Sequence, residues 1–172
     1  MKTRSELHPI LLQNGKYELP STSYTLSSEE KTRLLSVLKH LRVPDGYASN
    51  IFRCVNLKEH KLFTLKSHDC HILMQDLLPI TLTVAKDNDL VDIIWALSTF
   101  MKELCAKVLT LEKLDEAGAN VVVTLCRMEK LFPFSFFTIM VHLIMHLTEE
   151  AKLGGPVLYR WMYLIEILEF TL

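Results

Sequence analysis

The spacing of apolar side chains predicts a helical protein. From Ser27 onward, apolar residues recur at intervals of three and four, which places them on one face of an α-helix. Ser27 and Glu30 have the spacing of a capping box, so the first helix is expected to begin there and to run to about Leu41. The same repeat predicts further helices over 67–78 and 88–109, from 110 through at least Met128 with a break at Pro133, over 135–150 and from 157 onward. The expected fold class is therefore all-α, a single domain of five or six helices.

The N-terminal residues lack this repeat. Prolines and the Asn14-Gly15 pair, which favour turns, interrupt short apolar pieces there. We expect an irregular, turn-rich arm over 1–26, with at most a short strand, followed by a helical domain over 27–172. Residues 47–66 also lack a clear period and are expected to be extended or irregular.

The pattern also assigns inward faces to the helices. Cys70 falls on the apolar stripe of the helix over 67–78, which Pro79 is expected to end. Trp95 and Trp161 fall on apolar faces and are expected in the core. These assignments predict a chain whose large side chains pack between helices.

Polar residues and glycine mark the ends and weak points of the helices. Thr110 and Ser135 are expected N-caps. Three aspartates within 87–92 crowd a helix start, where carboxylates stabilise the helix dipole, and we favour this over a cation site. Gly118 interrupts a predicted helix at a cost of roughly 1 kcal/mol relative to alanine.

Charge is unevenly distributed along the 172 residues. The net charge of −1 excludes a uniformly basic nucleic-acid binder. Residues 1–64 nevertheless carry ten Lys or Arg against six Asp or Glu, and 65–172 carry nine against fourteen. An anionic partner is expected to meet the N-terminal third, unless its cations are only a solvated helix face. The candidate DNA contacts are Lys31, Arg33, Lys39, Arg42 and Arg53.

Cysteine spacing and hydropathy bear on the compartment. The four cysteines form no C-x-x-C pair, and no signal peptide is recognised, so reduced thiols in the nucleus or cytoplasm are expected. The most apolar stretch, 131–147, includes Thr138 and two histidines. It is therefore expected to be a buried helix rather than a membrane span.

Two histidine pairs have spacings that place both rings on one side of a helix. His142 and His146 are four residues apart, and His68 and His71 are three apart. Together the two pairs could supply four nitrogen ligands to a structural zinc. The alternative is that His142 and His146 hydrogen-bond within the core, while the other pair lies at the surface or caps a helix. No P-loop, hydrolase elbow or dinucleotide-binding motif is present, and no small-molecule substrate is evident.

Five segments carry a resemblance to a known family. They are ELHP (6–9), VPDGYASNI (43–51), LKSHDCHILMQDLLPI (65–80), FPFSFFTIMVHLIMHL (132–147) and GPVLYRWMY (155–163). In content and order they resemble the domain of unknown function 4218, over nearly the whole chain. That domain follows the transposase core in plant En/Spm (CACTA) DNA transposons. The resemblance implies a piece of a transposase, or of a host gene descended from one.

The resemblance also implies where chemistry would lie. The transposase core of such elements resembles an RNase H-type nuclease with three acidic residues and divalent metal, and the first two acids belong upstream of this domain. His142 and His146 resemble a pair that helps to bind structural zinc in related transposases. Glu166 is a candidate remnant of the last acid, or a plain carboxylate of an amphipathic helix.

The sequence departs from the family pattern at four positions. Phe134 and Leu164 replace prolines, Thr138 replaces an aspartate and Ile167 replaces an arginine. We expect an eroded copy that is truncated at its C-terminus. The expected function is a non-catalytic insertion or accessory part of a transposase, which positions DNA or packs on the nuclease core. A zinc-stabilised structural or interaction module without a DNA role is the alternative. Autonomous nuclease activity is not expected, because one carboxylate cannot assemble a three-acid site.

Overall fold

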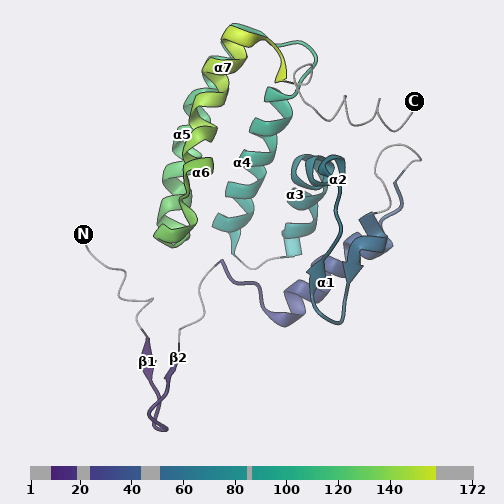
Figure 1. The fold of residues 1–172 in the computed structure, drawn as a ribbon, viewed down its shortest axis with the longest axis vertical. Coiled ribbons are helices and arrows are strands. Elements are labelled where there is room, and N and C mark those ends of the chain that lie inside the picture. Colours follow the sequence, from purple (N-terminus) through teal and green to yellow (C-terminus); the bar gives the residue numbers. More distant parts are fainter. Residues whose placement is uncertain (1–8, 19–23, 44–50, 85–86, 158–172) are drawn as a thin grey trace.

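The structure is a computed structural model that describes residues 9–18, 24–43, 51–84 and 87–157 (Figure 1). It is mostly α-helical, with two short antiparallel strand pairs, which confirms the predicted all-α class. No described helix combines the length and the apolar character that crossing a bilayer requires. The elements are β1 (Ile10–Leu11), β2 (Tyr17–Glu18), α1 (Ser28–His40), η2 (Ile51–Cys54), β3 (Val55–Asn56), β4 (Lys61–Leu62), α2 (Ser67–Ile72), η3 (Leu73–Leu77), α3 (Leu78–Thr81), η4 (Leu82–Val84), α4 (Asn88–Leu104), α5 (Leu111–Leu131), η5 (Phe134–Phe136), α6 (Ile139–Leu143), η6 (Ile144–His146) and α7 (Leu147–Gly154).

Local capping explains where the long helices begin. Ser27 Oγ accepts a hydrogen bond from the Glu30 amide at 3.3 Å, and the Glu30 carboxylate accepts one from the Ser27 amide at 2.8 Å. This is the predicted capping box. Asp87 caps α4 and Thr110 caps α5 through their side-chain oxygens. Short polar side chains thus set the starts of three helices.

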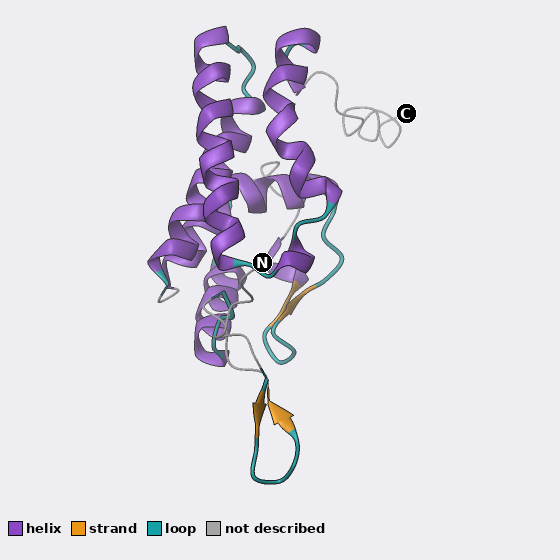
Figure 2. Cartoon of the chain, turned by 90° about the vertical axis from the view of Figure 1, so that its left-hand side faces the viewer, coloured by secondary structure: helices purple, strands orange, loops and turns teal. Residues whose placement is uncertain are grey.

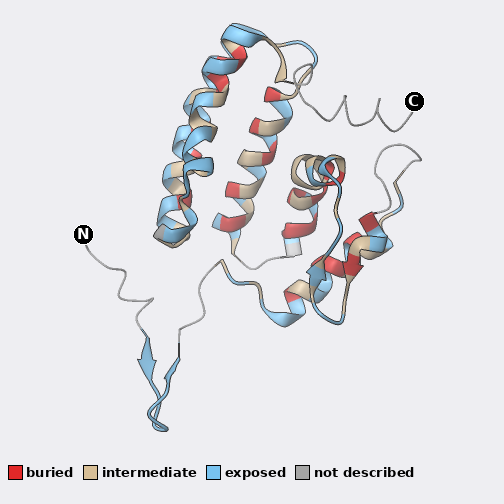
Figure 3. Ribbon diagram, viewed as in Figure 1, coloured by how far each residue is buried: buried red, intermediate tan, exposed pale blue. Residues whose placement is uncertain are grey.

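The buried side chains form two clusters, and α4 contacts both (Figure 3). The first cluster centres on α1 and includes Leu38, which is almost fully buried. The second lies between α4, α5 and α7 and is built around Phe100 and Val121. Ile94 of α4 packs against the first cluster, whereas Phe100, further along the same helix, belongs to the second. The chain therefore has two parts that share α4. The N-terminal lobe packs around the first cluster, and the helical bundle of α4, α5 and α7 packs around the second.

The N-terminal arm contains a β-hairpin. Ile10 pairs with Glu18 and Leu11 with Tyr17, across a turn that contains Gly15 at φ +76°. A positive φ suits glycine, which has no Cβ to clash. Figures 1 and 2 show this hairpin pointing away from the helices. A second hairpin, β3–β4, lies in the region predicted to be extended or irregular.

The predicted helix over 67–78 is interrupted, and its inward face differs from the prediction. A π-helical turn, η3, separates α2 from α3, and Pro79 lies buried inside α3 rather than ending the helix. Because a π-turn inserts an extra residue, the stripe rotates around the axis. Asp69 and Ile72 are buried, whereas Cys70 is exposed, so its predicted place in the core was wrong.

The predicted helix over 135–150 is also broken. Ser135 lies in the 3-10 turn η5 instead of acting as an N-cap, and α6 begins only at Ile139. The Phe132 and Phe136 rings stack at 4.6 Å, and the Phe136 amide donates to the Pro133 carbonyl at 2.9 Å. These contacts hold the aromatic segment in a separate turn.

Other differences concern the ends and faces of the long helices. The helix predicted over 88–109 ends at Leu104, because the chain turns there into α5. Trp95 was expected in the core, yet 53% of its surface is exposed. It faces away from both clusters that α4 contacts. Trp161 lies outside the described residues.

Candidate functional site

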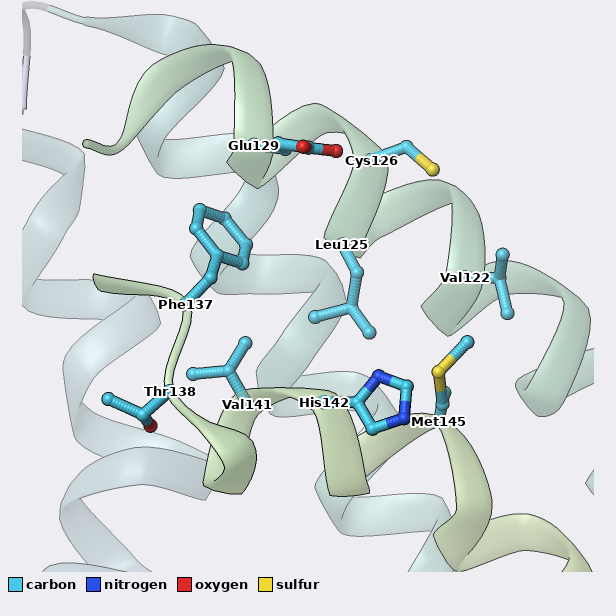
Figure 4. A pocket seen from close by; sticks show the side chains of 9 residues that line it. All are labelled: Val122, Leu125, Cys126, Glu129, Phe137, Thr138, Val141, His142 and Met145. Atoms are coloured by element: carbon cyan, nitrogen blue, oxygen red, sulfur yellow. The ribbon is translucent and has the colours of Figure 1, made fainter. Parts of the chain in front are cut away.

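A groove of about 300 Å³ runs between α5 and α6 (Figure 4). Its apolar lining comes from Val122, Leu125, Phe137, Val141 and Met145. Its polar lining comes from Cys126, Glu129, Thr138 and His142. Beside it, α6 has no buried residue, and Ile139 and Met140 are 72% and 68% exposed. The most apolar stretch of the chain is thus largely at the surface, which corrects the expectation of a buried helix.

The groove edge carries the predicted histidine pair. His142 and His146 are exposed, so the expectation that they hydrogen-bond inside the core was wrong. Their Nε2 atoms are 3.4 Å apart, and the rings meet edge to face at 72°. Two nitrogens that each lie about 2.0–2.1 Å from a tetrahedral zinc are separated by about 3.3–3.4 Å. The pair has the separation that two ligands of one zinc require.

The second histidine pair lies elsewhere. His68 and His71 are on α2, and Figure 1 shows α2 and α6 on opposite sides of α4. Burial lowers the pKa of His71, and the nearby charge of His68 lowers it further. Among the residues that the structure describes, no three His, Cys, Asp or Glu side chains gather to hold a metal ion. The four histidines therefore do not form one site.

The cysteines are free, as expected of reduced thiols. Burial raises the pKa of Cys105, and burial together with the charge of Asp69 raises the pKa of Cys54. Both shifts favour the protonated, less reactive thiol. Cys70 and Cys126 are exposed, and Cys126 lines the α5–α6 groove.

The five predicted DNA contacts lie on the N-terminal lobe but not on one continuous face. Lys39 donates a hydrogen bond to the Val55 carbonyl at 3.2 Å, so it ties α1 to β3. Arg33 is exposed on α1, and Lys31 is half-buried. Arg42, just after α1, is exposed, and so is Arg53 in η2. The five cations therefore come from α1, from the residues just after it and from η2.

Two exposed aromatic residues on the same lobe were missed by the sequence pattern. Phe52 of η2 is 38% exposed, and Phe63, just after β4, is 50% exposed. The Arg53 guanidinium lies 5.7 Å from the centre of the Phe52 ring. The Phe63 amide donates to the Cys54 carbonyl at 3.0 Å, which joins the two segments. Because this region has no regular period, only a search for aromatics beside cations could have found them.

The charge of the described residues differs before and after residue 66. Residues 28–43 and 51–66 carry eight Lys or Arg against three glutamates, one of which, Glu30, is buried in the capping box. The described residues after 66 carry six Lys or Arg against twelve Asp or Glu. The predicted asymmetry is therefore a property of the folded surface, and the basic part coincides with the N-terminal lobe.

Several charges of the bundle are used in ion pairs between helices. Arg127 of α5 lies 3.6 Å from Asp89 and 3.5 Å from Asp92 of α4, so these two aspartates do more than cap a helix. Lys152 of α7 lies 2.5 Å from Asp115 of α5. Hydrogen bonds to Asp115 and Glu149 raise the pKa of Lys152. These pairs connect helices of the bundle and point to a structural use of its charges.

Comparison with known proteins supports the resemblance over part of the chain. Residues 104–171 match the model of a family described as domain of unknown function (DUF4218). The match begins at the last residue of α4 and includes α5, α6 and α7, with the two C-terminal motifs. The three N-terminal motifs precede it. No curated protein and no solved structure matches the chain.

Proposed function

We propose that the chain is a non-catalytic accessory part of a CACTA-type transposase, and that its N-terminal lobe positions DNA. The observation that carries this proposal is the excess of Lys and Arg on the N-terminal lobe, which also exposes Phe52 and Phe63, in an otherwise acidic protein. Cations neutralise phosphates, and exposed aromatic rings stack on unpaired bases. The resemblance to the domain of unknown function 4218 supports the transposase context, and the family match covers the bundle rather than this lobe.

The geometry of the N-terminal lobe favours contacts with a single DNA strand over insertion of a helix into a groove of duplex DNA. Thr32 of α1 and His60 of the β3–β4 hairpin are hydrogen-bonded at 2.9 Å, so this contact joins α1 to the hairpin. The Arg53 guanidinium lies beside the Phe52 ring, in an arrangement in which the cation can reach the phosphate next to a base that stacks on the exposed ring. Since stacking on aromatics tolerates any base, binding without strong sequence preference is expected.

Fluorescence anisotropy with single-stranded and duplex DNA at 50 and 200 mM salt tests this function. Arg53→Ala should weaken binding and lower the slope of log affinity against log salt by about 0.7–0.9, the contribution of one phosphate contact. Phe52→Ala should weaken single-strand binding by roughly 1–3 kcal/mol with an unchanged slope. Lys113→Ala, an exposed cation on α5, is the matched control and should change neither quantity.

Affinity of the full chain no greater than that of a charge-matched unrelated protein would contradict DNA positioning. Equal weakening by Lys113→Ala and Arg53→Ala would contradict the assignment to the N-terminal lobe. Glu166, the candidate remnant of a catalytic acid, lies outside the described residues, and the proposal gives it no part.

A second candidate function is zinc-assisted interaction through the α6 histidines. The 3.4 Å separation of the His142 and His146 Nε2 atoms favours it. The described residues supply no third ligand, so water or a partner protein would complete the coordination. Because both imidazole rings are exposed, bound zinc would not neutralise a buried charge. It would fix both rings at the groove edge.

Zinc titration followed by calorimetry tests this candidate. The full chain should bind Zn²⁺, show a higher melting temperature when loaded, and lose that increase with a chelator. His142→Ala should abolish the effect, because a single exposed imidazole is a weak ligand. His68→Ala is the matched control and should leave it intact. Equal zinc binding by the His142→Ala/His146→Ala double variant would refute this site.

A further inference from the structure

The β1–β2 hairpin is an apolar arm without cover. All ten residues from 9 to 18 are exposed, including Ile10 at 56%, Leu11 at 61% and Tyr17 at 72%. Hydrogen bonds within the hairpin include the one from the Leu12 amide to the Lys16 carbonyl at 2.8 Å. A two-stranded hairpin is marginally stable in water unless its apolar face packs against something.

The α5–α6 groove is an apolar surface large enough for a few side chains of the hairpin. Its floor consists of Leu125, Val141 and Met145, and Phe137 forms one wall (Figure 4). At about 300 Å³ it lies at the lower limit of typical binding pockets, which suits a few side chains of an arm rather than a whole helix. Exposed Ile139 and Met140 extend the apolar area beside it.

The foot of the arm is fixed beside the chain's own groove. Tyr24, the first described residue after the arm, stacks on Phe132 at 5.3 Å, and Phe132 stacks on Phe136. Phe136 in turn contacts Phe137 of the groove wall, with ring centres 5.7 Å apart. This row of aromatic rings places Tyr24 close to the groove wall, while the hairpin itself points away from the bundle (Figures 1 and 2).

We infer that the hairpin of one chain packs into the α5–α6 groove of a second copy of the chain. An arm that starts beside its own groove and points outward can reach the groove of a neighbour, and a twofold axis makes the exchange reciprocal. One pair of charges is complementary, because the hairpin carries Lys16 and the groove carries Glu129. The inferred dimer is independent of the proposed DNA contact, which lies on the N-terminal lobe.

The first test is the oligomeric state of the full chain by sedimentation equilibrium. The wild-type chain is expected to be a dimer at micromolar concentration. Leu11→Asp should raise the dissociation constant at least tenfold, since it places a charge against the groove floor. Val108→Asp, at a 78% exposed site in the α4–α5 turn, is the matched control and should not change the constant. A wild-type chain that stays monomeric at 100 micromolar would overturn the inference.

The second test uses the exposed Cys126 thiol in the groove. In Leu11→Cys, a short bismaleimide should link position 11 to Cys126 of the second copy and give covalent dimers. The yield should disappear in Leu11→Cys/Cys126→Ser and persist in Leu11→Cys/Cys70→Ser, which removes the other exposed thiol. Linkage of the same positions within a monomer would overturn the second-copy assignment. Linkage to Cys70 instead would contradict the assignment of the hairpin to the α5–α6 groove.

Discussion

Replacing Phe100 by alanine should lower the free energy of unfolding by about 3–5 kcal/mol, the largest effect that we expect of any single change. Phe100 is 4% exposed and lies where α4 meets α5 and α7. Its removal leaves a cavity that Leu104 and Val121 cannot fill without moving the helices. Since domains of this size are stable by about 5–15 kcal/mol, the loss is a large fraction of the total.

Trp95→Ala, five residues before Phe100 on the same helix, is the matched control. Trp95 is 53% exposed, so its truncation should cost roughly 1 kcal/mol or less. Urea denaturation followed by far-ultraviolet circular dichroism measures both variants. Equal losses would show that α4 is packed on the face that the hydrophobic pattern had assigned to Trp95, contrary to the structure.

Gly118→Ala should destabilise the chain by about 1 kcal/mol, although alanine is the better helix former by a similar amount. A Cβ at position 118 would lie 3.0 Å from Oγ1 of Thr148, a buried residue of α7. The close approach of α5 and α7 at this point leaves little room for a methyl group unless the Thr148 side chain moves. Steric strain of about 2 kcal/mol would therefore outweigh the gain in helix propensity.

A double-mutant cycle tests this contact. Thr148→Ala removes the atoms nearest to the added methyl group, so the Gly118→Ala/Thr148→Ala variant should be more stable than the sum of the single changes predicts by at least about 1 kcal/mol. Asn120→Ala, at an exposed position of the same helix, is the control and should be slightly stabilising. A stabilising Gly118→Ala would contradict the close packing of the two helices.

Gly118 shows how far sequence reasoning reaches. Residue propensities correctly identify it as a weak point of the helix over 110–131, but the reason for glycine lies on another helix, at Thr148. Cys70 and Trp95 were misplaced for related reasons. A π-turn rotates the α2 stripe, and the outer side of α4 is covered by neither cluster. The pattern identifies apolar faces without showing which of them receives a partner.

Some features of the candidate sites follow from sequence spacing, and others depend on contacts between distant segments. Sequence spacing correctly places His142 and His146 within contact distance, because residues four apart on a helix are neighbours. It could not relate them to His68 and His71, which another helix holds on the far side of α4. The α5–α6 groove and the exposed Phe52 and Phe63 depend on contacts between segments and carry no periodic pattern.

The sequence alone determined the helical class, the starts of three helices and the basic character of the N-terminal third. These follow from local hydrogen bonds, from apolar spacing and from counting charges, none of which requires distant contacts. Only the tertiary structure decided which apolar faces are buried, that the two histidine pairs lie apart, and that α6 and the β1–β2 hairpin present apolar side chains to solvent. Burial depends on the surfaces that meet, and their meeting is a property of the folded chain.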